Sequence, residues 1–132
     1  MKEEVQTTFT EMLDISSDID KAVLFGPDGV LASNIPSEGQ TPTVALAEEL
    51  VRLGGLRAAD MGSQPLTQLV IEAAGGLVFL ARETADDGMT VLATGKKGSR
   101  VGLVLYDLKT CLRDAREALT ADTRPERTGG EA

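Results

Sequence analysis

The sequence contains no histidine and only one cysteine, Cys111. Histidine is the side chain that most often serves as a general base and as a metal ligand, so its absence removes the usual basis for both. A single cysteine cannot form an intramolecular disulfide, which favours a reducing compartment. Cys111 falls on the apolar face of a predicted helix. A place in the core is favoured over a nucleophilic role, because no histidine can activate the thiol.

Positive charge and long apolar runs are also scarce. The formal net charge is −8, which opposes contact with a phosphate backbone or an anionic membrane, so we expect no nucleic-acid partner. The longest apolar runs are about five residues, whereas a membrane helix needs ~20. The first residues, Met1 to Val5, lack the apolar segment of a signal peptide. The expectation is a cytoplasmic protein without membrane insertion.

Two further patterns in the sequence are candidate sites for anion binding or acid–base chemistry. The run from Gly95 to Arg100 precedes a predicted helix N-terminus, where backbone N–H groups can bind anions, but it lacks the spacing of a phosphate-binding loop. A solvated loop is favoured, and contact of its lysines with an acidic partner is the alternative. The pair Asp86-Asp87 sits in a turn, where aspartate is common for backbone reasons. The sequence therefore predicts no catalytic residue, no metal site and no cofactor, and the chain is not expected to be an enzyme.

The pattern of apolar residues predicts three helices and five strands. The helices are expected at 3–14, 41–61 and 100–119, and the strands at 21–26, 30–33, 65–74, 77–82 and 89–93. Three of these strands are apolar on both faces and need cover on both sides. We predict an α+β fold in the order α-β-β-α-β-β-β-α. Its five-stranded antiparallel sheet has one helix on one face and the two terminal helices on the other. One domain is expected over residues 1–121, with a disordered tail at 122–132.

The predicted helix 41–61 is too apolar for a helix that only covers a sheet. Thr41 is its expected N-cap, and Pro42 its first residue. At about 100° per residue its apolar side chains spread over roughly half the circumference, more than the stripe of slightly over 100° that a core requires. The side near Ala47, Gly54 and Ala58 is expected to pack on the sheet.

The other side of this helix is predicted to meet a second copy of the chain. Its residues are Leu46, Leu50, Leu53 and Arg57. The polar edge, with Glu48, Glu49, Arg52 and Asp60, is the expected platform for a third protein. The adjacent glycines Gly54-Gly55 leave two alternatives, a break in the helix or a continuous helix with a close neighbour, and the second is favoured.

Two sequence runs stand beside this order of elements: the hairpin Ala22–Ser33, with its Gly26-Pro27-Asp28-Gly29 turn, and the loop-to-helix run Gly98–Tyr106. Together with the order of elements, they resemble the Roadblock / dynein light chain family. The resemblance covers about Lys2 to Leu119. It points to the bacterial type of small-GTPase regulator.

The resemblance implies a homodimeric regulator or scaffold that binds a small Ras-like GTPase and modulates its nucleotide cycle without supplying a catalytic residue. It also implies that the middle helices pair across the dimer and that the following strand joins its mate, which adds Leu69 and Val70 to the interface. The Gly54-Gly55 pair departs from the expected middle helix. The alternative is a small-molecule sensor of profilin-like or PAS-like architecture, for which Gln68, Thr90 and Thr94 are the candidate polar groups.

Overall fold

A computed structural model describes residues 2–123 of the chain. The eight elements are α1 (Lys2–Ile15), β1 (Ile19–Gly26), β2 (Gly29–Ser33), α2 (Ser37–Asp60), β3 (Gln68–Ala73), β4 (Gly76–Arg82), β5 (Thr90–Lys96) and α3 (Val101–Thr123). Their order is the predicted α-β-β-α-β-β-β-α. None of the helices within these residues is long and apolar enough to cross a membrane.

The five strands form one antiparallel sheet in the order β2-β1-β5-β4-β3. The central strand β5 is buried along most of its length, because helices cover both of its faces. Strands β2 and β3 lie at the two edges. Within the described residues β3 pairs only with β4, from Gln68↔Ala81 to Ala73↔Gly76.

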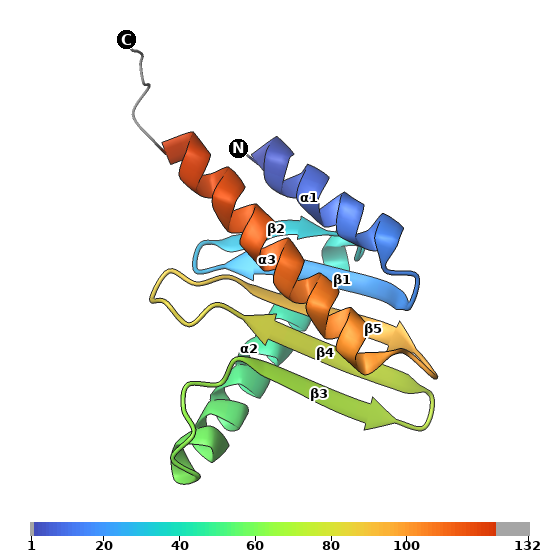
Figure 1. The fold of residues 1–132 in the computed structure, drawn as a ribbon, viewed down its shortest axis with the longest axis vertical. Helices are drawn as coiled ribbons and strands as arrows, with labels where there is room; N and C mark the ends of the chain where they lie inside the picture. Colours follow the sequence, from blue (N-terminus) through green and yellow to red (C-terminus); the bar gives the residue numbers. More distant parts are fainter. Residues whose placement is uncertain (1, 124–132) are drawn as a thin grey trace.

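The predicted layers are confirmed (Figure 1). Helices α1 and α3 lie side by side on one face of the sheet, and α2 crosses the other. The core is accordingly in two parts. The larger cluster, between the sheet and the terminal helices, is built around Phe9, Phe79 and Leu108. The smaller cluster, between the sheet and α2, is built around Phe25, Ala47 and Leu80.

The start of α2 differs from the prediction. The helix begins at Ser37, with Pro36 at the N-cap position and Pro42 inside the helix. The carbonyl of Pro36 accepts a hydrogen bond from the N–H of Gly39 at 2.8 Å, which closes the first turn before Thr41. Pro42 has no N–H to donate to the carbonyl of Glu38, so α2 lacks one backbone bond there. Both residues are exposed, so water can bond to that carbonyl.

The end of β5 and the two ends of α3 also differ from the prediction. Strand β5 continues to Lys96, which pairs with Gly76, so the predicted loop is partly strand. The hydroxyl of Ser99, just before α3, donates to the carbonyl of Lys96 at 2.6 Å. Helix α3 continues to Thr123, so the predicted tail begins too early. Residues 124–132 of that tail lie outside the described residues.

Helix α2 is continuous through Gly54 and Gly55, as favoured from the sequence. A Cβ at Gly54 would lie 3.0 Å from Cδ2 of Leu66, whereas one at Gly55 would meet nothing within 4 Å. The close neighbour of Gly54 is therefore a side chain from the segment that leads into β3.

Candidate protein-protein interface

Exposed apolar side chains gather on α2 and on the neighbouring strand β3. The exposed fractions are 59% for Leu46, 50% for Leu53, 56% for Leu56 and 64% for Met61 on or just after α2, and 39% for Ile71 on β3. A stripe of leucines at helical spacing is normally core, but these remain in solvent. Apolar residues concentrated in this way indicate a contact surface.

The end of α2 overhangs the open edge of the sheet. Figure 1 shows that its C-terminal half extends past β3, close to the first residues of that strand. The outer edge of β3 pairs with no other strand in the described part of the chain. An unpaired edge of this kind can accept another strand.

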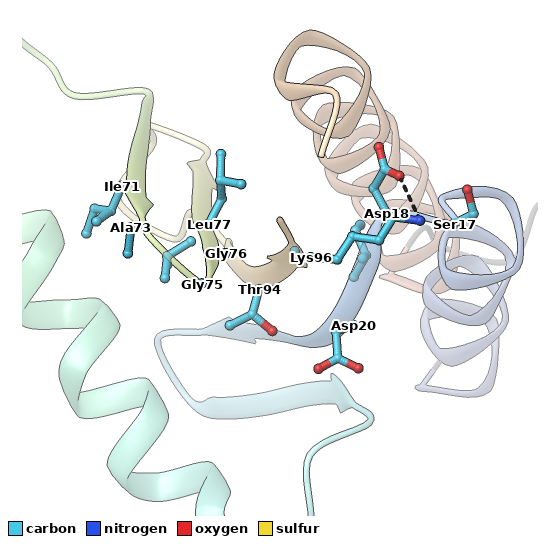
Figure 2. Close-up of a pocket in the computed structure, with 13 residues that line it drawn as sticks. Ser17, Asp18, Asp20, Ile71, Ala73, Gly75, Gly76, Leu77, Thr94 and Lys96 are labelled. Carbon is cyan, nitrogen blue, oxygen red and sulfur yellow. Dashed lines mark ion pairs between the residues drawn. The ribbon is translucent and has the colours of Figure 1, made fainter. Parts of the chain in front are cut away.

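A corner of the sheet is left uncovered at the opposite end of β3. The hollow has a volume of about 550 Å³, and its lining includes Ile71, Ala73, Val78 and Thr94. Strand alternation places Ile71 and Ala73 on the same face as Leu69, which packs in the α2 cluster. Figure 2 shows both side chains on the side of β3 on which α2 runs, away from Asp18 and Leu77.

The six predicted interface residues occupy different environments. Leu46, Leu53 and Arg57 are exposed on α2. Leu50, Leu69 and Val70 are half-buried; the first two pack in the α2 cluster, while Val70 packs against the cluster of the terminal helices.

Sequence reasoning did not assign Leu56, Met61 or Ile71 to the interface. Spacing from Leu53 could have identified Leu56, and alternation from Leu69 could have identified Ile71. Their exposure depends on the angle at which α2 crosses the sheet, which the sequence pattern does not give.

The predicted platform for a third protein is divided in the structure. Glu48 and Arg52 border one hollow of about 280 Å³, which also contains Arg82 and Thr90. Glu49 pairs with Arg52, with Nε to Oε1 at 3.2 Å, and this hydrogen bond lowers the pKa of Glu49. Asp60 is exposed two turns further along α2 and lines no part of that hollow.

The lysine-containing run before α3 is held by a buried carboxylate. Asp18 accepts hydrogen bonds from the backbone N–H of Arg100 at 2.8 Å and from its Nε at 3.1 Å, and Lys96 Nζ lies 3.6 Å from its other oxygen. The bonds from Arg100 lower the pKa of Asp18. The single carboxylate of Asp18 thus balances one of the three positive charges of this run. Asp18 lies between the predicted helix 3–14 and strand 21–26, and the sequence pattern assigned it no role.

The groups that the sequence offers for chemistry are the carboxylates, Cys111 and the polar residues named for a sensor cavity. Within 2–123, no group of three or more Cys, Asp or Glu side chains is placed to hold a metal ion. Cys111 is 2% exposed, and burial raises its pKa to about 12, so the thiol is unreactive at neutral pH. Thr90 and Thr94, named for a sensor cavity, border different hollows, and Gln68 borders neither.

Among known proteins, solved structures match this chain. No protein-family model and no curated protein matches the sequence. A Roadblock/LC7 domain from Streptomyces avermitilis superposes with a TM-score of 0.72 at 21% identity, covering 87% of this chain and 97% of that one. The chain has the Roadblock fold.

Two further structures with the Roadblock fold are similar over nearly the whole chain. Myxococcus xanthus MglB matches with a TM-score of 0.75 at 11% identity, covering 94% of this chain and 93% of that one. A structure described as MglB with a tetrameric arrangement matches with a TM-score of 0.70 at 16% identity, covering 89% and 91%. Because these structures match about nine-tenths of the chain or more, they confirm the predicted Roadblock fold as a whole.

Proposed function

We propose that this chain is a non-catalytic homodimeric regulator or scaffold that binds a small Ras-like GTPase and modulates its nucleotide cycle. The dimer is formed by α2 and β3 of two copies, and the polar edge of α2 faces the GTPase. The observation that carries the proposal is the overhang of α2 beyond the open edge of β3. The similarity to MglB structures, one of them described as tetrameric, supports self-association.

A two-fold axis beside β3 would pair the open edge of this strand and would also cover the overhanging end of α2. Antiparallel pairing of β3 with its mate would place the start of one strand opposite the end of the other. The overhanging end of α2 lies at the start of its own β3. It would therefore reach the end of the partner's β3, where the hollow with Ile71 and Ala73 lies.

The same arrangement explains why the overhanging helix end is apolar. Leu53, Leu56 and Met61 are at least half exposed in the single chain, and contact with the partner's sheet would remove them from water. Full burial of one such side chain contributes about 1.5–3 kcal/mol. Leu53 lies on the overhanging half of α2 and is the most informative position for a test.

The proposed dimer is tested by replacing one exposed leucine on each face of the molecule with aspartate. Leu53→Asp is expected to give a monomer at micromolar concentration by light scattering after gel filtration, while wild-type protein is a dimer. Leu103→Asp is the matched control, because Leu103 is 43% exposed on α3, away from α2, and should leave the dimer intact. Leu50 is less suitable because it packs in the α2 cluster. A monomeric wild-type protein would contradict the proposal.

The GTPase partner is tested by capture and by enzyme kinetics. Wild-type protein immobilised on a resin should retain a small GTPase from the source cell, identified by mass spectrometry. Added protein should then change that GTPase's rate of GTP hydrolysis or nucleotide release.

The variant Glu48→Lys/Arg52→Glu, which exchanges charges at the polar edge, should weaken capture and keep the dimer. Glu117→Lys on α3 is the control. If no GTPase is retained, or if the edge variant retains it like wild type, the assignment of that partner or surface is wrong.

A further inference from the structure

The groove between α1 and α3 is an acidic, partly apolar surface on the face of the molecule opposite α2. The two helices lie side by side along the sheet. The lining residues are Thr8, Glu11, Met12, Ile15, Asp107, Thr110, Cys111 and Asp114. Lysine and arginine are absent from this lining, whereas three carboxylates belong to it.

Helical spacing places the lining residues of each helix on one flank of that helix, so the two flanks form the walls of the groove. On α1, Thr8, Glu11 and Ile15 repeat at intervals of three and four residues, so they lie on one flank. On α3, Asp107, Thr110 and Asp114 do the same. The basic residues of α3, such as Lys109 and Arg116, fall on its other flank by the same spacing.

The groove combines a buried floor with an exposed apolar rim. Met12 and Cys111 form the floor and are 5% and 2% exposed. Ile15 is 75% exposed at the rim, although it is a large apolar side chain at the end of a helix whose other apolar residues are largely buried. Leu103, 43% exposed, lies one turn before Asp107 on the same flank of α3.

The charges of the groove are incompletely balanced from within the chain. Asp114 pairs with Arg113, with Nε to Oδ1 at 3.1 Å, and the arginine side chain is 64% exposed. No ion pair is seen for Glu11 or Asp107 among the described residues. An apolar seam edged by carboxylates fits an amphipathic helix that presents leucine-like residues to the seam and lysine or arginine on both sides.

We propose that the α1–α3 groove binds a basic amphipathic helical segment of a partner protein. The segment lies along the groove as a third helix, with apolar residues at intervals of three and four on Ile15 and Leu103. Its lysines or arginines face Glu11, Asp107 and Asp114. This surface is separate from α2 and β3, so it remains available in the proposed dimer and does not depend on the GTPase assignment.

The test uses a synthetic 14-residue helical peptide with leucine at positions 3, 7 and 10 and lysine at most others, labelled for fluorescence anisotropy. Wild-type protein should bind it at physiological salt. Glu11→Gln/Asp107→Asn should weaken binding at least tenfold, because the isosteric amides remove charge without changing shape. Ile15→Ser should weaken binding of the peptide at least fivefold. Because Ile15 is exposed, this substitution should leave the fold intact.

Matched controls separate the groove from the general acidity of the chain. Asp28→Asn/Asp86→Asn removes the same charge from two exposed turns of the sheet that do not line the groove. Tyr106→Ser removes a 64% exposed apolar side chain from the outer face of α3. Both controls should bind the peptide like wild type. The proposal is overturned if the controls weaken binding as much as the groove variants. It is also overturned if oligolysine of equal charge binds as tightly as the peptide.

Discussion

Asp18 links the end of β5 to the start of α3 through one nearly buried carboxylate. Its side chain is 6% exposed and receives two hydrogen bonds from Arg100, which hold its pKa below the ordinary value. A carboxyl whose pKa is lower in the folded state stabilises the fold above its unfolded pKa, and this contribution disappears as the pH falls through the folded pKa.

Replacing Asp18 by asparagine should therefore reduce stability in a pH-dependent way. Asp18→Asn keeps the shape but cannot pair with Arg100 as a charge, so its free energy of unfolding at pH 7 should fall clearly below that of wild type. The difference should shrink below about pH 4, where aspartate protonates. Urea unfolding at several pH values measures this, with the exposed Asp20→Asn as control. A difference that stayed constant with pH would rule out the charge as the cause.

The adjacent glycines of α2 offer a matched pair of substitutions. Gly55→Ala should raise the free energy of unfolding by about 0.5–1 kcal/mol, since alanine favours the helix and no atom lies near its new methyl group. Gly54→Ala should give a smaller gain or a loss, because its methyl group would lie 3.0 Å from Leu66. Equal effects at both positions in thermal unfolding would show that Leu66 does not restrict Gly54.

Between elements, Glu83 and Arg116 connect the end of β4 to α3. Arg116 donates two hydrogen bonds to the carboxylate, at 2.7 and 3.2 Å, and the N–H of Met89 adds a third at 3.0 Å. Partial burial alone raises the pKa of Glu83, but the bonds from Arg116 and Met89 outweigh it and the net pKa is lowered. The contribution of this pair is therefore present above the ordinary glutamate pKa and lost in acid.

Removing this charge should loosen the β4–β5 connection. Glu83→Gln is expected to lower the free energy of unfolding by about 1–2 kcal/mol at pH 7, since hydrogen bonds to a charged, half-buried group are lost. Asp87→Asn is the control, because that carboxylate is 75% exposed and lies 3.6 Å from Arg116. Hydrogen exchange of the Met89 amide should quicken in the first variant only. Unchanged exchange would show that Glu83 does not hold the connection.

At the scale of the whole molecule, the stability of a dimer depends on protein concentration. Unfolding that separates two chains becomes harder as concentration rises. A tenfold increase should raise Tm by roughly 3 °C for two chains of this length. Differential scanning calorimetry measures this, and Leu53→Asp should abolish the dependence. A concentration-independent Tm for wild type would contradict an obligate dimer.

The layers of the fold follow from the amino-acid pattern alone, because periodicity shows which faces must be buried. Strands such as 77–82 are apolar on both faces and required helices on both sides, and the i, i+3, i+4 pattern of the last helix placed Cys111 and Leu108 in the core. The turn at Pro27-Asp28-Gly29 fixed the first hairpin through local backbone preferences. Helix ends were less predictable: the bond from Gly39 to the Pro36 carbonyl decided the start of α2 without a conventional capping side chain.

The exposure of the apolar residues of α2 and the long-range pairs of side chains depend on the folded chain. The excess apolar width of the middle helix was visible in the sequence, but its division between sheet and solvent depends on the crossing angle of α2. That angle turns Leu50 toward the sheet, leaves Leu46 and Leu53 exposed, and carries the end of α2 past the edge of β3. Asp18 and Arg100 are 82 positions apart, and Glu11 and Asp107 line one groove from two different helices. Local pattern carries no signal for such pairs, since only the folding of the chain brings them together.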